Sequence, residues 1–207
     1  DPPTPQISTA DNVTYTFTGN IFDSIVVLRD NIVIDGADHI VQGAGQQYSV
    51  GVNLDSVSNV TIRSIKVTGF YEGIRLWGSN DNNVNNNTLT NNIEFGIYLV
   101  NSSRNILNRN KASNNGIAGI ELSSAPGCRE NLIVENILSD NKVGIALAYS
   151  DDNKIYHNNF NNTIYQVASY FSTNIWDDGY PSGGNYWSDY TGVDANGDGI
   201  GDTPYVI

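Results

Sequence analysis

The residues best suited to a defined chemistry lie near the carboxyl terminus, in Asp194–Asp202, which reads DANGDGIGD. Its first half fits the calcium-loop signature D-x-[DN]-x-[DN]-G. Five residues would supply oxygen ligands, four from side chains and one from its carbonyl: Asp194, Asn196, Asp198, Asp202 and the carbonyl of Ile200. Gly199 allows the sharp turn that wraps these oxygens around one point. Tyr205 stands where a helix-flanked calcium loop carries a bidentate Glu. The sequence therefore predicts a structural Ca²⁺ that staples this end of the chain.

Residues suited to catalysis form no convincing set. His39 and His157 are far apart in the sequence, and no nucleophile is paired with either. The adjacent acids Asp151 and Asp152 resemble a glycosidase pair, but they occupy a slot where other repeats carry serine, which favours a solvated turn. Four charged residues could line one face: Arg63, Lys66, Glu72 and Arg75. The lone Cys128 favours a structural role. We assign no catalytic residue, and the sequence leans against an enzyme.

Composition limits the setting and the partners. The net charge of −12 disfavours nucleic acid, whose phosphates would be repelled. No run of eighteen apolar residues is present, so we expect no membrane span. The opening residues 1–5 are proline-rich and read as the trimmed end of an exported protein whose signal peptide is gone. Five N-x-[ST] sequons are candidate glycosylation sites: Asn12, Asn59, Asn86, Asn101 and Asn161. Together these features predict a secreted or cell-surface protein.

The elements that carry these residues are predicted by an internal repeat. Pairs of apolar residues separated by one position recur, most of them directly after a glycine: Val52/Leu54, Ile74/Leu76, Ile97/Leu99, Ile120/Leu122 and Ile145/Leu147. Their starts are 22, 23, 23 and 25 residues apart, and an earlier repeat begins near Ile25. One repeat cannot bury its apolar face, but stacked repeats bury a continuous one. The pattern predicts a right-handed parallel β-helix of about six coils, each 22–26 residues long.

Asparagine marks the turns of each predicted coil. One column precedes an apolar residue by two positions and a second column follows five residues later: Asn82, Asn105, Asn131 and Asn153, then Asn87, Asn110, Asn136 and Asn158. Asn tolerates left-handed backbone, and identical stacked amides can bond from coil to coil. A leucine-rich repeat has a similar period, but these Asn-, Ser- and Gly-rich returns are poor in helix formers. Regular aliphatic positions oppose disorder.

Both ends of a solenoid need caps, because terminal coils expose strand edges. We divide the single domain into an N-terminal segment with a capping strand (1–24), the coils (25–166) and a C-terminal cap that holds the calcium loop (167–207). The cap is rich in Tyr, Trp, Gly and Asp. Its aromatic residues are expected to pack on the last coil. A platform on which sugar rings stack is the alternative.

The coils resemble the NosD-type repeats of the carbohydrate-binding and sugar-hydrolase (CASH) class of β-helix. The resemblance is carried by Tyr15–Ile21 (YTFTGNI), Asp30–Gly36 (DNIVIDG) and the repeated Gly-Ile-x-Leu. The tail Trp176–Tyr190 resembles tails of secreted or surface-layer proteins of archaea, particularly methanogens. The NosD name implies maturation of a copper centre. This sequence departs from that chemistry, since it has no Met, one Cys and two distant His.

Three functions are compatible with these features. We expect a non-catalytic, extracellular structural or adhesive module that self-associates in a filament, sheath or surface layer. A protein that binds or cleaves carbohydrate is the first alternative, with glycans as partners. An accessory protein of a metal centre is the second.

Overall fold

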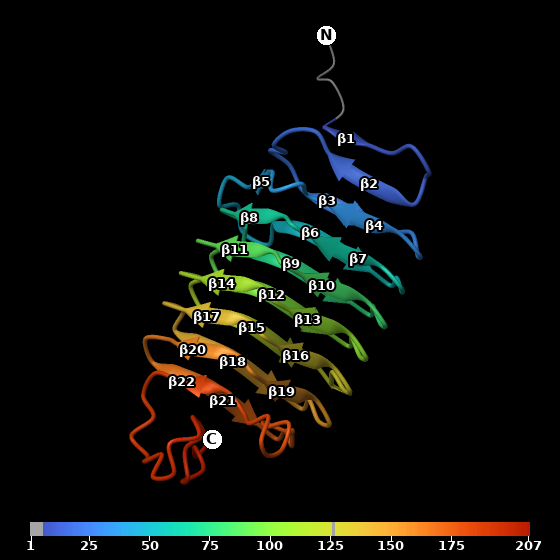
Figure 1. The fold of residues 1–207 in the computed structure, drawn as a ribbon. Coiled ribbons are helices and arrows are strands. Elements are labelled where there is room, and N and C mark those ends of the chain that lie inside the picture. The colour runs from blue at the N-terminus through green and yellow to red at the C-terminus, as the bar shows by residue number, and fades with distance from the viewer. Residues whose placement is uncertain (1–5, 126) are drawn as a thin grey trace.

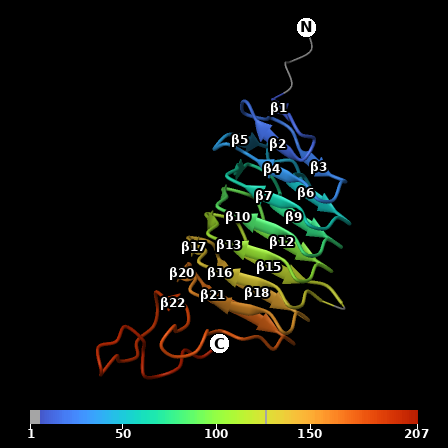
Figure 2. The same cartoon turned by 45° about the vertical axis from the view of Figure 1, so that its right-hand side comes forward.

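The computed structural model describes residues 6–125 and 127–207 as a stack of short strands, with the first and last described segments at opposite ends (Figure 1). The stack is a parallel β-helix, as predicted. Three sheets, here called A, B and C, run the length of the stack, and each coil passes through C, A and B in turn. Figure 2 shows the same rows of strands from a second direction. Among the described residues no helix could cross a membrane.

The strands are two to six residues long, and those of sheet C are mostly the longest. Sheet A contains β1 (Ile7–Ser8), β2 (Thr14–Phe17), β4 (Val33–Asp35), β7 (Thr61–Arg63), β10 (Asn83–Asn85), β13 (Ile106–Asn108), β16 (Leu132–Val134) and β19 (Lys154–Tyr156). Sheet B contains β5 (Ile40–Gln42), β8 (Lys66–Thr68), β11 (Thr88–Thr90), β14 (Lys111–Ser113), β17 (Ile137–Ser139), β20 (Asn159–Asn161) and β22 (Tyr186–Trp187). Sheet C contains β3 (Ile25–Val27), β6 (Val50–Asp55), β9 (Glu72–Trp77), β12 (Phe95–Val100), β15 (Ala118–Ser123), β18 (Val143–Ala148) and β21 (Tyr165–Tyr170).

The register places equivalent residues of successive coils directly beside one another. Ile97, for example, pairs with Ile74 of the preceding coil and with Ile120 of the next. These aliphatic side chains point inward and are fully buried. The recurring glycine before each pair has a steric reason, since a Cβ at Gly96 would lie 2.6 Å from the carbonyl oxygen of Gly119. The repeat found in the sequence is therefore the spacing that brings identical positions into van der Waals contact.

Buried asparagines connect the coils at the corners between the sheets. The two predicted columns are present, each one longer than predicted, and a third was missed: Asn82–Asn105–Asn131–Asn153–Asn174, Asn87–Asn110–Asn136–Asn158–Asn185 and Asn92–Asn115–Asn141–Asn162. The Oδ1 of Asn136 accepts the backbone N–H of Asn110 at 2.9 Å and its amide Nδ2–H at 3.1 Å. Its Nδ2 donates to the carbonyl of Leu107 at 2.9 Å. Each ladder thus satisfies buried backbone groups where no strand partner can.

The stack is longer than the predicted six coils, because sheets B and C contain seven strands each and sheet A eight. Thr14–Phe17 already forms a coil strand, paired in parallel with β4, although it lacks the Gly-Ile-x-Leu marker. At the other end, Tyr186–Trp187 from the aromatic tail adds a strand to sheet B. β1 covers the first edge of sheet A in antiparallel orientation. The strand at Thr14–Phe17 lies in the predicted capping segment 1–24, whereas the strand at Tyr186–Trp187 was not predicted because its packing residues are not those of the repeat.

Cutting one Asn ladder should be costly. We expect Asn136→Ala to destabilise the fold by roughly 2–4 kcal/mol, because the N–H of Asn110 and the carbonyl of Leu107 lose buried partners. The control is Asn159→Ala, which removes an exposed amide from β20. Urea unfolding followed by circular dichroism measures both free energies of unfolding. Equal values for the two variants would contradict a structural role for the ladder.

Candidate functional site

The outer side of sheet C carries a group of acidic and aromatic side chains that the fold does not need for its core. We call this group the sheet C face and define it by its members: Tyr71, Glu72, Arg75, Trp77, Glu94, Phe95, Tyr98 and Glu121. Alternation along the strands turns Arg75, Trp77, Tyr98 and Glu121 outward while their neighbours Ile74, Ile97 and Ile120 point into the core. The other four residues lie at the start of β9 and β12 or directly before them: Tyr71, Glu72, Glu94 and Phe95. Three glutamates against one arginine make the face acidic.

Glu121 is the residue of this face with the most unusual environment. It lies beside Tyr98 in the register of β12 and β15, with Ala146 on its other side. Burial raises the pKa of the Glu121 carboxyl to about 7, and the nearby charge of Glu94 contributes. Glu121 makes no hydrogen bond or ion pair with the residues that the structure describes. A half-buried carboxyl without a partner is available to a ligand.

Glu94 affects the pKa of the other two glutamates, and its own carboxylate is held by the Tyr71 hydroxyl. The Tyr71 hydroxyl donates a hydrogen bond to Glu94 Oε1. That bond raises the pKa of Tyr71 to about 12, so the phenol stays protonated at neutral pH. The charge of Glu94 raises the pKa of both Glu72 and Glu121, although burial is the larger cause for each. The negative charge of Glu94 thus acts on both of the more buried glutamates of the face.

Arg75 balances part of this charge and holds the exposed tryptophan of the face. Its Nε donates to Asn53 Oδ1 at 3.0 Å and its Nη1 lies 3.3 Å from Glu72 Oε2. The guanidinium sits 5.6 Å from the ring centroid of Trp77, within reach of a cation–π contact. Trp77 is 48% exposed. The face therefore presents a flat aromatic ring, which Arg75 contacts on one side, on the same sheet as the three glutamates.

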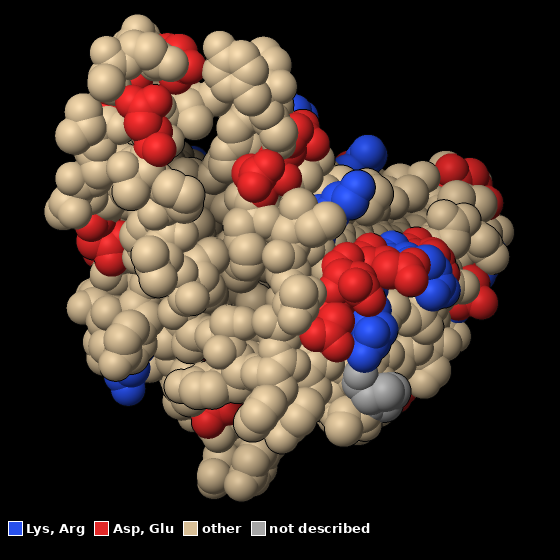
Figure 3. Space-filling model, turned by 90° about the horizontal axis from the view of Figure 1, so that it is seen from below, with Lys and Arg blue, Asp and Glu red and all other residues tan. Residues whose placement is uncertain are grey.

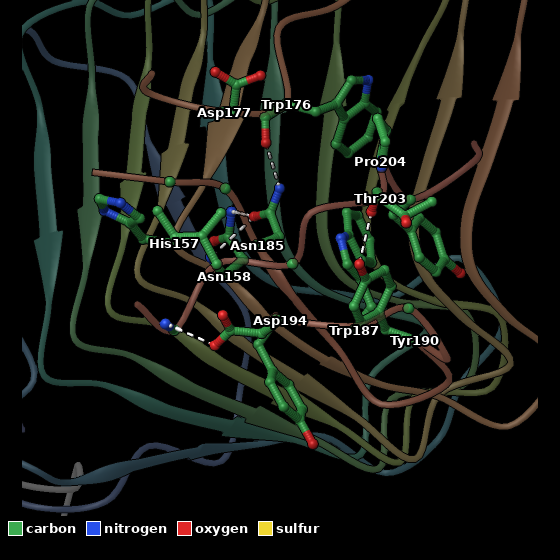
Figure 4. A pocket seen from close by; sticks show the side chains of 18 of the residues that line it. His157, Asn158, Trp176, Asp177, Asn185, Trp187, Tyr190, Asp194, Thr203 and Pro204 are labelled. Carbon is green, nitrogen blue, oxygen red and sulfur yellow. Dashed lines mark hydrogen bonds between the residues drawn. The ribbon is translucent and has the colours of Figure 1, made fainter. Parts of the chain in front are cut away.

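A cavity lies under the C-terminal cap, between the last coil and residues 176–207. Its volume is about 860 Å³. Figure 3 looks onto this end of the molecule, where the surface is hollowed between the cap segments, and Figure 4 shows the lining side chains. Trp176, Trp187 and Tyr190 contribute rings, while His157, Asp177 and Asp194 contribute polar groups. The aromatic cap residues thus both pack on the coils and border a cavity.

The predicted calcium loop lies beside this cavity in a tightly turned conformation. Asp194 accepts the backbone N–H groups of Gly197 at 2.7 Å and Gly199 at 2.9 Å. Asp202 Oδ2 accepts the N–H of Ala195 at 2.7 Å, which closes the loop. Asn196 donates to Asp198 Oδ2 at 3.0 Å. Within the described ranges, no three His, Cys, Asp or Glu side chains gather closely enough to hold a metal. Calcium binding by Asp194, Asn196, Asp198, Ile200 and Asp202 remains a prediction.

The other residues considered from sequence have structural explanations or stay untested. Arg129 forms ion pairs with Asp151 at 2.9 Å and Asp152 at 3.3 Å. The acidic pair is therefore part of a surface salt bridge at a corner of the coil. Cys128 is buried in a column of serines, where its Sγ accepts the N–H of Ser102. His157 contacts Ser182 in the cap. All five sequon asparagines are exposed: Asn12, Asn59, Asn86, Asn101 and Asn161. Their glycosylation stays a prediction.

Sequence reasoning noted Glu72 and Arg75 but missed Glu94 and Glu121. One signal was available, because Glu121 occupies the variable position of a Gly-Ile-x-Leu motif. That position points outward in every coil, so a glutamate there meets the side chains of its two neighbouring rungs. The aromatic shielding by Tyr98 depends on register and was not visible before the coils were aligned.

Comparison with known proteins places the chain in a family. Residues 7–192 match the family described as periplasmic copper-binding protein (NosD). A stretch of 76 residues is 41% identical to the probable ABC transporter binding protein NosD of Stutzerimonas stutzeri and to that of Pseudomonas aeruginosa. The stretch covers 36% of this chain but only 17% and 18% of those relatives, so the match spans less than a fifth of their length.

Two solved structures share the fold at low sequence identity. The enzymatically active domain of bacteriophage CBA120 tailspike protein 2 has a TM-score of 0.57 and 14% identity, and the match covers 82% of this chain and 36% of that one. The catalytic domain of a GH87 α-1,3-glucanase, in complex with nigerose, has a TM-score of 0.52 and 16% identity, with 87% and 42% covered. At these identities the likeness concerns the fold alone. The family match extends over most of the sequence, and the chain therefore belongs to the NosD family of parallel β-helix proteins.

Proposed function

We propose that the protein is an extracytoplasmic carbohydrate-binding β-helix whose ligand lies on the sheet C face. The observation that carries this proposal is Glu121, a half-buried carboxyl that has no partner among the described residues and lies in the same face as the exposed ring of Trp77. Sugars offer both complements, since hydroxyls bond to carboxyl oxygens and the apolar face of a pyranose packs on an aromatic ring. The face is built on strands, which hold such groups at fixed spacing.

The family and the shared fold agree with this proposal. The family description names the periplasm, which supports an extracytoplasmic setting. One of the two structural neighbours above is a glucanase domain in complex with nigerose, so a parallel β-helix can accommodate a sugar ligand. We propose binding, not cleavage, because Glu94 is bonded to Tyr71 and Glu72 is paired with Arg75, whereas a glycosidase uses two carboxyls that act on the substrate.

A copper role fits the described residues poorly. Cys128 is buried in the serine column and accepts a backbone N–H, so its sulfur is not presented to a metal. His157 contacts the cap residue Ser182, whereas His39 belongs to a coil near the other end of the stack. Copper sites require clustered imidazole or sulfur ligands. We therefore derive no step through copper for this chain.

Assembly into a filament, sheath or layer is the competing proposal, and the geometry offers it less support. The first edge of sheet A is covered by antiparallel β1, and the last coil is covered by Trp187 and the rest of the cap. Covered ends hinder end-to-end stacking. Electron microscopy of the purified protein distinguishes the two, since filaments or sheets would favour assembly.

We also propose that Ca²⁺ binds the loop of Asp194–Asp202 and stiffens the cap. The backbone of this loop already turns around Asp194, and side-chain or carbonyl oxygens occur at alternate positions. Bound Ca²⁺ would contact some of the carboxylate oxygens that accept backbone N–H groups of the loop in this structure.

The glycan proposal predicts a specific loss of binding. A glycan array should identify a ligand, and Trp77→Ala should lower its affinity about tenfold in calorimetric titration because the stacked ring is lost. Tyr149→Ala removes an exposed ring outside the face and should leave the affinity unchanged. A protein that binds no glycan, or a Trp77→Ala variant that binds as well as the native chain, would refute the proposal.

Burial of Glu121 predicts a dependence of stability on pH. Its folded pKa of about 7 exceeds its ordinary value of 4.5, so folding favours the protonated form. The native chain should lose stability as the pH rises from about 4.5 to about 7 and lose no more above that. Glu121→Gln should be more stable than the native chain at pH 8, on the order of 2 kcal/mol, and similar at pH 4.

Urea unfolding at pH 4 and pH 8 measures this difference. Glu135→Gln is the matched control, because Glu135 is an exposed glutamate paired with Arg109 on the other side of the coil. It should show no gain at pH 8. A Glu121→Gln variant without such a gain would mean that the carboxyl is solvated.

The calcium proposal predicts a shift in thermal stability. At a calcium concentration about a hundred times Kd, the melting temperature should rise by roughly 5–10 °C over that in chelator. Asp198→Ala should abolish the shift, whereas Asp23→Ala, an exposed aspartate at the other end of the stack, should keep it. The staple is ruled out when chelator leaves the melting temperature of the native chain unchanged.

A further inference from the structure

The cavity under the cap is separate from the sheet C face and shares no lining residue with it. Its volume of about 860 Å³ lies within the range of small-molecule sites. The described lining residues come from the last coil and from the cap, so that two parts of the chain meet around it (Figure 4). The cavity is open to solvent on one side, so a ligand can enter it without displacing the cap.

The aromatic walls of the cavity are held in fixed positions. Trp187 is stacked between Phe160 of the last coil, at 4.5 Å between ring centroids, and Tyr205 of the tail, at 4.3 Å. The Tyr190 hydroxyl donates to the carbonyl of Thr203 at 2.7 Å. A Cβ at Gly201 would lie 2.1 Å from that hydroxyl, so the glycine admits the Tyr190 ring at this place. These contacts pre-organise the wall and lower the entropic cost of binding.

Two further rings border the cavity and remain open to solvent. Tyr180 is 79% exposed and Tyr186 is 62% exposed, although both are cap residues of a kind that normally packs. Exposed tyrosines at the rim of a cavity have one apolar face free for a ligand. Both rings are therefore accessible to a ligand that reaches the rim.

The charges around the cavity restrict the ligand. Its described lining contains the carboxylates Asp177, Asp194 and Asp202 and no Lys or Arg. When the Asp194–Asp202 loop is kept free of Ca²⁺ by chelator, as in the test below, phosphates, sulfates and uronic acids would meet acidic oxygens without a compensating Lys or Arg in the described lining. Hydroxyl groups, in contrast, donate well to carboxylates. The lining also contains other polar side chains, among them His157, Asn159, Ser182 and Ser188.

We propose that this cavity is a second binding site, which takes the end of an uncharged oligosaccharide. One or a few sugar rings would stack on Tyr180 and Tyr186 at the rim, while their hydroxyls bond to Asp177 and the neighbouring polar groups. The site does not depend on the sheet C face, so either site can exist without the other. A glycan chain that occupies both sites at once would bind more tightly than at either site alone, because its second contact is intramolecular.

The three tryptophans allow the two sites to be observed separately. Trp176 and Trp187 line the cavity, whereas Trp77 belongs to the sheet C face. In a ¹H–¹⁵N NMR spectrum of the full chain with chelator present, Trp77→Phe identifies one of the three indole N–H signals. The probes are neutral gluco-, manno- and galacto-oligosaccharides, with oligogalacturonate as an anionic probe and choline as a cationic one.

We expect at least one neutral oligosaccharide to shift the Trp176 and Trp187 signals, in the Trp77→Phe protein as in the native chain. Tyr186→Ala and Tyr180→Ala should each weaken this response about tenfold. Tyr149→Ala, the matched exposed tyrosine outside both sites, should leave it unchanged. Both cavity variants remove exposed rings, and an unchanged melting temperature checks that the cap is intact.

Several results would overturn the proposal. The first is that no neutral oligosaccharide moves the Trp176 and Trp187 signals. The second is that these signals move as strongly in Tyr186→Ala and Tyr180→Ala as in the native chain. The third is a stronger response to oligogalacturonate or choline than to any neutral oligosaccharide. A shift of the Trp77 signal alone would refute the cavity site while supporting the sheet C face. A shift confined to the Trp176 and Trp187 signals would support the cavity site and count against the sheet C face.

Discussion

The structure depends on how the corners of each coil satisfy their backbone. Between sheets the chain turns inward, and its N–H groups and carbonyls there are buried without strand partners. The asparagine amide supplies one acceptor and two donors in a fixed plane, which is what a corner requires from the rung above and the rung below. The side-chain amide of Asn110, for instance, accepts two hydrogen bonds from Asn87 and donates one each to Asn136 Oδ1 and the carbonyl of Val84. Serine does the same with fewer groups, and Cys128 replaces it once without breaking the column.

Because ladders and aliphatic columns hold the coils, the outer side chains are free to vary. The outward column that runs through sheet C contains Asn53, Arg75, Tyr98, Glu121 and Ala146 at successive rungs, which share no chemical type. Inward columns, in contrast, are aliphatic almost throughout, with Phe160 of the last coil as an exception. Opposite charges are paired at the corners, as in Arg104 with Asp81 and Arg129 with Asp151. Figure 3 shows red and blue atoms interleaved in an arc along one side, with large neutral areas elsewhere. The carboxyl of Glu121 is outside this pairing.

The sequence predicted the interior of this molecule better than its ends and its outer surface. Inward residues such as Ile97 and ladder residues such as Asn136 recur because every coil meets the same packing problem, so spacing alone identifies them. The first coil strand at Thr14–Phe17 and the cap strand at Tyr186–Trp187 meet a different problem, and their residues do not match the repeat. The environment of Glu121 depends on which residues neighbour it across rungs. The cavity depends on how an irregular tail folds back on the last coil, which no period encodes.

Side-chain size along one column explains why the unpartnered acid lies where it does. A residue on a β-helix face has neighbours about 4.8 Å away on the adjacent rungs, so each side chain is shielded or exposed by the sizes of two others. Tyr98 on one side of Glu121 removes water from the carboxyl, while Ala146 on the other side leaves a gap. A large residue at both positions would have buried the acid completely, and two small ones would have left it solvated with an ordinary pKa. The step from Tyr to Ala gives both desolvation and access, which is the combination that a binding group requires.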